Sequence, residues 1–160
     1  MTDRLIITAQ RNLVVTPREL WAVTSDTSRY AEWVTTVREV LIHHGTATSE
    51  LTYRERIAGA GPFEATVEWQ VQQLIPNKLR IDSTERIGPL SDVLNIFRFE
   101  PIEGGIACSM VYEFHFRVRP KFLGKPVLKV MSASIQRDFD QSMRNLEDLT
   151  LSERDLNISR

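Results

Sequence analysis

The sequence predicts an α+β fold in which a curled antiparallel sheet of about seven strands surrounds one long C-terminal helix, with two short helices after the first strand. Apolar residues recur three or four positions apart from Leu128 to Leu149, which indicates an amphipathic helix over Pro126 to Leu151. Much of the remaining chain alternates apolar and polar residues, as half-buried strands do. Because no second helix of that length is visible, the apolar stripe must lie on the sheet.

Two short helices are expected between the first and second strands. Thr16 is a suitable N-cap for the first, and Glu19 stands at the capping-box position three residues later. The second is expected over Tyr30 to Trp33, with Ser28 or Thr27 as its cap. These helices connect the first strand to the second. The strands that follow are joined by short turns and are expected to pair as antiparallel neighbours.

The strands are expected between clusters of turn-forming residues such as Gly59 to Pro62 and Gly104-Gly105. The clearest alternation runs from Phe63 to Val71, where the intervening residues are polar. The expected strands cover residues 4–15, 37–44, 51–57, 63–71, 79–87, 93–99 and 108–118.

Composition restricts the class of protein. The chain of 160 residues has the size of one domain, so residues 1–160 are expected to form a single ligand-binding unit. A formal net charge of −1 argues against a nucleic-acid binder. The single cysteine, Cys108, and three histidines without ligand spacing predict neither a disulfide nor a metal, and no cofactor is expected. No long apolar run or secretion signal is visible, so the expected location is the cytoplasm.

The chain resembles the START-like superfamily (SRPBCC, Bet v 1-like), which has the helix-grip fold and includes pollen allergens, polyketide cyclase/dehydrase-like proteins and lipid-transfer domains. The resemblance covers nearly the whole chain. It rests on Thr16 to Trp21, Tyr30 to Trp33, Phe97 to Pro101 ahead of Gly104-Gly105, and Met143 to Leu146. It implies an apolar cavity between sheet and helix. Because members range from carriers to enzymes, it does not assign a function.

Strand parity and the helical stripe nominate residues that would line this cavity. They are Tyr53, Trp69, Phe97, Met110, Tyr112 and Phe114 from the strands, and Met131, Ile135 and Phe139 from the helix. The alternative is that these side chains only fill the core. Mouths of curled sheets are common sites for small molecules, so a ligand-binding role is a reasonable hypothesis for the set.

Three polar residues share the inward parity: Glu55, Glu85 and Asn95. They either orient a ligand or reach water near a strand end, and a bulge or a register shift would turn them outward. If a reaction is catalysed, the candidates for proton transfer are Glu55, Tyr53 and His43. The alternative for His43 is an exposed position at a strand end.

The sequence from Phe114 to Arg137 contains no acidic residue, and residues 117–129 carry most of its positive charges. Phe122 and Leu123 are interleaved with these charges in the loop Pro120 to Lys125, which could gate the cavity. Two interpretations remain open. The stretch is either a solvated loop, or it docks on an anionic membrane or an acidic protein.

Three hypotheses for the function follow. The first is a carrier or sensor that binds a hydrophobic or aromatic small molecule, lipid- or polyketide-like. The second is a polyketide cyclase/dehydratase-type enzyme that uses polar residues of the cavity. The third is a lipid-delivery or protein-interaction module that docks through residues 117–129. The sequence does not indicate an oligomeric state.

Overall fold

The computed structural model describes residues 3–43, 46–58 and 62–160. Its helices are α1 (Pro17–Thr24), α2 (Tyr30–Trp33) and α3 (Gly124–Ile158). Its strands are β1 (Leu5–Leu13), β2 (Val37–Ile42), β3 (Thr52–Ala58), β4 (Glu64–Ile75), β5 (Leu79–Ile87), β6 (Leu90–Ile102) and β7 (Ala107–Val118). Short 3₁₀ turns cover Thr27–Arg29, Glu103–Gly105 and Lys121–Leu123.

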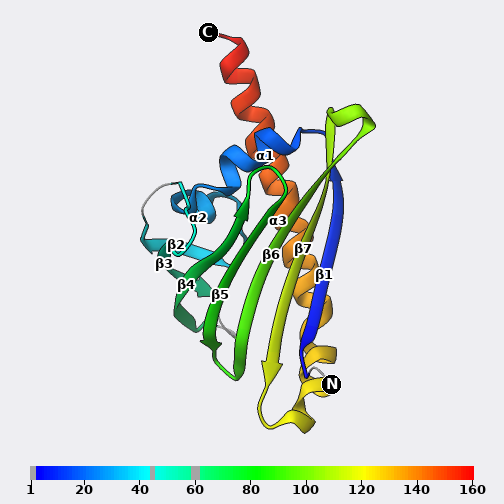
Figure 1. Ribbon diagram of the computed structural model, residues 1–160. Coiled ribbons are helices and arrows are strands. Elements are labelled where there is room, and N and C mark those ends of the chain that lie inside the picture. The colour runs from blue at the N-terminus through cyan, green and yellow to red at the C-terminus, as the bar shows by residue number, and fades with distance from the viewer. Residues whose placement is uncertain (1–2, 44–45, 59–61) are drawn as a thin grey trace.

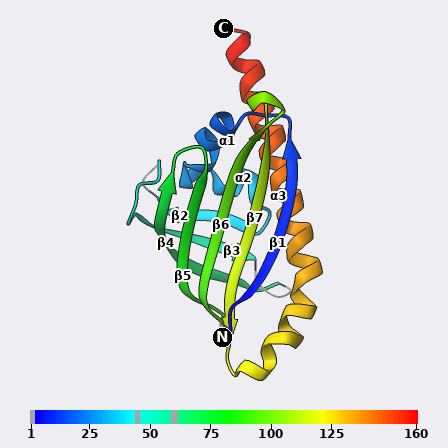
Figure 2. The same ribbon diagram turned by 45° about the vertical axis from the view of Figure 1, so that its right-hand side comes forward.

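The seven strands form one antiparallel sheet in the order β1-β7-β6-β5-β4-β3-β2. The sheet curls strongly, so that β2 and β3 cross the direction of β6 and β7, and α3 runs alongside β1 (Figures 1 and 2). Apart from the β1–β7 pair, each strand neighbours the next one in the chain, as short turns between antiparallel strands require. This arrangement confirms the predicted fold class.

The start of α1 is built as the sequence predicted. The Thr16 side chain accepts a hydrogen bond from the Glu19 backbone N at 3.2 Å, and the Glu19 carboxylate accepts one from the Thr16 backbone N at 2.8 Å. The cap before α2 differs from the prediction. Asp26, rather than Ser28 or Thr27, caps the 3₁₀ turn by accepting from the Ser28 backbone N at 3.0 Å.

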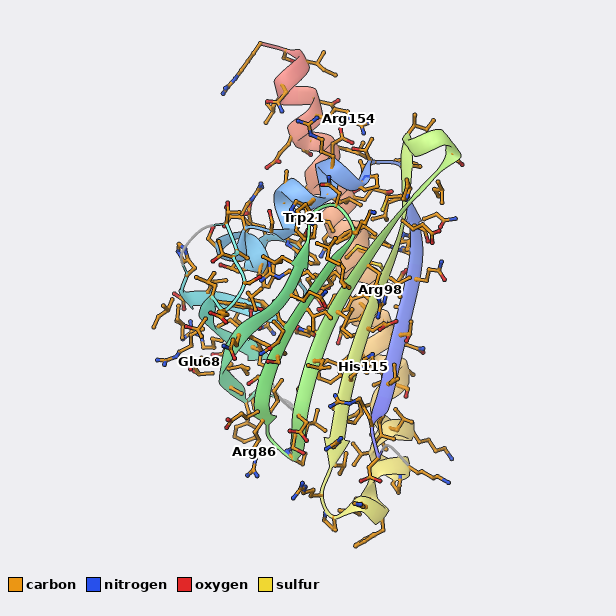
Figure 3. The ribbon with its side chains drawn as sticks, viewed as in Figure 1. Trp21, Glu68, Arg86, Arg98, His115 and Arg154 are labelled. Atoms are coloured by element: carbon orange, nitrogen blue, oxygen red, sulfur yellow. The ribbon has the colours of Figure 1, made fainter. Side chains whose placement is uncertain are left out.

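Helix α3 is longer than predicted at both ends. Its last turns extend beyond the sheet, where Arg154 is labelled in Figure 3. Two nitrogens of Arg154 donate to the Glu19 carboxylate at 2.6 and 2.7 Å, and Arg29 pairs with Glu153. Because ion pairs rather than an apolar stripe tie this extension to the N-terminal helices, hydrophobic periodicity could not reveal it.

Burial changes along α3. In residues 139–150 the inward side chains Phe139, Met143 and Leu146 are buried, whereas in residues 127–135 Leu128 and Met131 are only half-buried although they contact the core. We refer to residues 139–150 as the buried half of α3 and to residues 127–135 as its half-exposed half.

Two strand ends are shorter than predicted. Strand β2 ends at Ile42, so His43 follows it, and His44 lies outside the described residues. Strand β4 begins at Glu64, and the preceding Phe63 is exposed rather than inward-facing. Most of the turn predicted at Gly59 to Pro62 also lies outside the described residues.

Candidate functional site

Cross-strand pairing gathers the predicted aromatic residues on the inner face of the sheet. Tyr53 lies opposite Trp69, and Phe97 lies opposite Tyr112. The Phe97 and Tyr112 rings meet edge to face with centroids 4.7 Å apart, and α3 adds Phe139, whose ring stacks on Tyr112 at 3.8 Å. All five side chains are buried. At this level, therefore, Phe97, Tyr112 and Phe139 form a continuous aromatic contact from the sheet to α3.

The other predicted cavity residues are divided between two environments. Met110 and Phe114 of β7 are buried, so they belong to the interior. Met131 and Ile135 of α3 are half-buried and belong to its half-exposed half. The set therefore extends from a packed interior to the protein surface.

Glu55 is the most unusual group in this interior. It faces inward as predicted, and only 3% of its surface is exposed. Trp69 Nε1 donates to its Oε1 at 2.8 Å, whereas its Oε2 has no hydrogen-bond partner among the described residues. Burial raises the pKa of the Glu55 carboxyl to about 7, and the nearby charge of Asp82 adds to this rise. Glu55 can therefore gain or lose a proton near neutral pH.

A second buried carboxylate, Asp82, has many partners. Arg80 Nε donates to its Oδ1 at 2.9 Å, and the Tyr53 hydroxyl donates to its Oδ2 at 2.5 Å. Arg80 Nη1 also donates to the Thr24 carbonyl at 2.7 Å, and its guanidinium lies 5.0 Å from the centroid of the Tyr30 ring. Because the opposite charges are adjacent, with Arg80 Nη2 2.9 Å from Asp82 Oδ2, the pair neutralises itself, although Nη2 forms no hydrogen bond among the described residues.

The Arg80–Asp82 pair also corrects the predicted parity of β5. Sequence alternation placed Ile81 and Glu85 inward, but Arg80 and Asp82 face the interior with 1% exposure each, and Glu85 is exposed. Apolar side chains on the outer face of a sheet are common, so alternation alone can mislead. One sequence signal could have shown that Arg80 and Asp82 face inward. In an Arg-x-Asp strand segment the two charged residues share a face and can neutralise each other.

The remaining polar candidates have different positions. Asn95 lies on the inner face, opposite Asp82 on one side and Phe114 on the other, and is half-buried. His43 is exposed beyond the end of β2, which matches the surface interpretation rather than a position beside the buried Glu55.

Three inward tyrosines surround the two carboxylates. Burial raises the pKa of Tyr30, Tyr53 and Tyr112 above the ordinary value for a phenol. For Tyr112 the charge of Glu55 is the next largest cause, so the two groups influence each other. All three phenols therefore stay protonated at neutral pH and remain able to donate hydrogen bonds.

Two hollows on the surface lie away from this interior. One is lined by residues of the outer face of α3, Ala133, Gln136, Arg137, Asp140, Gln141 and Arg144. The other lies where β1, β7 and α3 begin or end. Neither is lined by a predicted ligand-binding residue. Among the described residues, no group of three His, Cys, Asp or Glu side chains could hold a metal ion.

The fold and the buried polar groups define a helix-grip protein with an ionisable group in an aromatic interior. Residues 4–150 match the family described as "Polyketide cyclase / dehydrase and lipid transport". The chain therefore belongs to this family, as the resemblance indicated. No curated protein matches the sequence.

Solved structures confirm the fold at low sequence identity. The protein TTHA0849 from Thermus thermophilus has a TM-score of 0.74 and 12% identity, with 93% of this chain and 99% of that chain covered. The ZhuI aromatase/cyclase from Streptomyces sp. R1128 has a TM-score of 0.74 and 13% identity, with 92% and 93% covered. Norcoclaurine synthase from Thalictrum flavum, in complex with dopamine and hydroxybenzaldehyde, has a TM-score of 0.69 and 12% identity, with 93% and 87% covered.

The helices in the described part of the chain differ from membrane spans in length or in hydrophobicity. None of them is both long and apolar enough to cross a bilayer.

Proposed function

We propose that the chain binds a hydrophobic or aromatic small molecule, lipid- or polyketide-like, between the curled sheet and α3, and acts as its carrier or sensor. The observation that carries this proposal is the unpartnered Oε2 of Glu55 inside an aromatic interior. The family description supports it. So does norcoclaurine synthase, which has the same fold and was solved with two aromatic compounds.

The energetics of Glu55 explain why a ligand would bind there. A buried acceptor without a partner costs about 1–3 kcal/mol, and a ligand hydroxyl that donates to Oε2 would remove this cost. The rings of Trp69, Tyr112 and Phe139 offer apolar faces to the rest of the ligand. Affinity would come from the apolar contact, and Glu55 would set the orientation.

Entry of the ligand requires movement, because the rings of Tyr112 and Phe139 are in contact. The half-exposed half of α3 is the part best suited to move, since Leu128, Met131 and Ile135 are only partly buried. In this proposal the ligand enters beside these residues and displaces the Phe139 ring to reach Glu55.

The experiment compares naphthol with its methyl ether in titration calorimetry. Both share one ring system, but only naphthol can donate a hydrogen bond. We expect wild type to bind naphthol about fivefold to tenfold more tightly, which corresponds to about 1–1.5 kcal/mol. Glu55→Gln should remove the preference, because its carbonyl can accept from Trp69 while its NH₂ replaces the acceptor Oε2.

Glu85→Gln is the matched control. It makes the same chemical change at an exposed position elsewhere on the sheet. It should retain the wild-type preference. The proposal would be wrong if neither compound binds wild type at millimolar concentration, or if Glu55→Gln discriminates as wild type does.

The pKa of Glu55, about 7, favours a second candidate function, a cyclase/dehydratase-type enzyme. In a dehydration, the carboxylate would take a proton from the carbon beside a ligand carbonyl. The hydroxyl on the next carbon would leave with a proton returned by the same carboxyl, releasing water. An aryl β-hydroxyketone tests this: wild type should form the conjugated ketone, and Glu55→Gln should bind the compound without converting it.

A further inference from the structure

The segment between β7 and the second turn of α3 concentrates positive charge, and we name residues 119–129 the basic tip. Three of the four lysines in the chain, Lys121, Lys125 and Lys129, lie here, and all three are exposed. Lys121 pairs with Asp3 at 2.7 Å. Within the described ranges, Lys125 and Lys129 form no ion pair, so their charges face solvent uncompensated.

Apolar side chains project from the same segment. Phe122 is 77% exposed and Leu123 is 39% exposed, in the 3₁₀ turn that precedes α3. The residue after this turn, Gly124, is buried against β1, and an added Cβ there would lie 3.3 Å from Leu5 Cδ1. Phe122 is therefore exposed to solvent two residues before a buried position.

The charges at the start of α3 oppose those that stabilise a helix. The N-terminus of a helix is its positive end and is stabilised by acidic residues, as Glu19 does for α1. The first turn of α3 contains no acidic residue, and its N-cap residue makes no side-chain hydrogen bond. Lysines there add to the positive field instead of balancing it. An external anionic surface would supply the missing negative charge.

Neighbouring groups extend this positive region. A surface hollow of about 190 Å³ beside the tip is lined by Arg4, Lys121 and Lys125, with Asp3 as its acidic member. Arg86, labelled in Figure 3, is exposed near the end of β5, and β5 and β7 finish at the same end of the molecule (Figures 1 and 2).

We propose that the basic tip docks the protein on an anionic lipid bilayer. Phe122 and Leu123 enter the headgroup region, and Lys125 and Lys129 contact lipid phosphates. An aromatic residue flanked by lysines suits such an interface, which takes up a ring among the headgroups and attracts positive charge. Electrostatic attraction to an acidic partner would account for the lysines alone, whereas insertion among headgroups also accounts for the exposed Phe122 beside them. This inference concerns where the protein works and does not depend on the ligand site.

The test is cosedimentation with vesicles of phosphatidylcholine alone, or of equal parts phosphatidylcholine and phosphatidylglycerol. Wild type should bind only the anionic vesicles, and about 1 M salt should release it because the Debye length falls to about 3 Å. Neutralising one lysine should weaken binding about fivefold, so Lys125→Gln with Lys129→Gln should weaken it about 25-fold. Phe122→Ser should also weaken it.

Matched variants at the other end of the molecule separate docking from general charge. Arg18→Gln with Lys78→Gln also removes two positive charges, and Ile106→Ser removes another exposed apolar side chain, 68% exposed against 77% for Phe122. These variants should bind as wild type does. The proposal is overturned if wild type does not bind anionic vesicles at low salt, or if the control variants lose as much binding. Binding of soluble polyglutamate without binding of vesicles would indicate an acidic protein partner and would also overturn it.

Discussion

The two halves of α3 belong to one continuous helix but have different surroundings. In the buried half, Met143 and Leu146 have no exposed surface, whereas in the half-exposed half Leu128 and Met131 are partly open to solvent. Both pairs lie on the apolar stripe, so hydrophobic periodicity does not distinguish them. The comparison shows that an amphipathic stripe predicts which face of a helix contacts the core, but not how completely each turn is buried.

The hydrogen bonds of α3 also differ between its two halves. In the buried half, Ser142 Oγ accepts from the Thr35 backbone N at 3.1 Å, and Asn145 Nδ2 donates to the Trp33 carbonyl at 3.2 Å. These bonds fix the helix to the last residue of α2 and to the segment that follows it. Just beyond the half-exposed half, Gln136 Nε2 donates to the Thr8 carbonyl of β1 at 3.1 Å. The buried half bonds both to β1, through Arg11 and Asp140, and to the region of α2.

The largest expected effect comes from a matched pair of leucine truncations. Leu146→Ala should lower the free energy of unfolding by about 3–4 kcal/mol, because it leaves a cavity at a fully buried position. Leu128→Ala should cost only about 1 kcal/mol, since this side chain is partly exposed to solvent and loses less buried area. Urea unfolding measures both values. Equal costs would show that the two halves are equally packed.

The pH dependence of stability tests the interior in which the buried half of α3 places Phe139, because Phe139 stacks on Tyr112 and the charge of Glu55 acts on Tyr112. The Glu55 pKa is raised from 4.5 to about 7, so the folded state holds this proton more tightly than the unfolded state. Its contribution is present below pH 4.5 and is lost as pH rises to about 7. The total change is about 3 kcal/mol at 1.36 kcal/mol per unit.

Glu55→Gln should abolish this slope, so the variant should be more stable than wild type above pH 7 and similar to it near pH 4.5. Chemical unfolding at several pH values measures the difference. If both proteins show the same dependence, Glu55 does not titrate near neutrality.

The rates of amide hydrogen exchange should differ between the two halves of α3. Backbone amides of residues 128–135 should exchange through local openings, at least about tenfold faster than those of residues 139–150, which need near-global unfolding. Mass spectrometry of overlapping peptides resolves the two ranges. Uniform protection along α3 would rule out the half-exposed half as the moving part in ligand entry.

The smallest expected effect concerns the far end of α3. The Arg154 guanidinium holds the pKa of Glu19 down to about 2, so this contribution to stability is present above pH 4.5 and lost as pH falls toward 2. Both side chains are about one-third exposed, and solvent screening limits the contribution to less than about 1 kcal/mol. Arg154→Gln should lower the unfolding free energy by that amount at neutral pH. A larger loss would mean that the helix extension supports the buried half.

The general architecture was predictable because the helix caps, the strand alternation and the helical stripe all indicated the same fold. The Thr16–Glu19 capping box, the alternation that turned Tyr53 and Glu55 inward, and the stripe of α3 were all confirmed. Such features depend on residues close together in the sequence, so the two-residue period of strands and the 3.6-residue period of helices reveal them.

The parts that failed depended on tertiary partners. Arg80 and Asp82 are buried because each neutralises the other and because Tyr53 completes the bonding of Asp82, which no period can show. The predicted inward parity of Glu85 was wrong for the same reason, because Arg80 and Asp82 are the residues of β5 that face inward. Alternation also could not show that Tyr112 and Phe139 would stack on each other, because their contact joins two distant elements.

The distribution of lysines has a practical consequence for handling the protein. Amine-reactive reagents would attach mostly at Lys121, Lys125 and Lys129, leaving only Lys78 at the opposite end of the sheet. A protein coupled to a sensor chip through its amines would therefore be oriented, with the α1 end outward and the Phe122 end against the matrix. Lipid capture would be blocked in that orientation while small molecules could still diffuse in, so attachment chemistry alone could make the two kinds of binding experiment disagree.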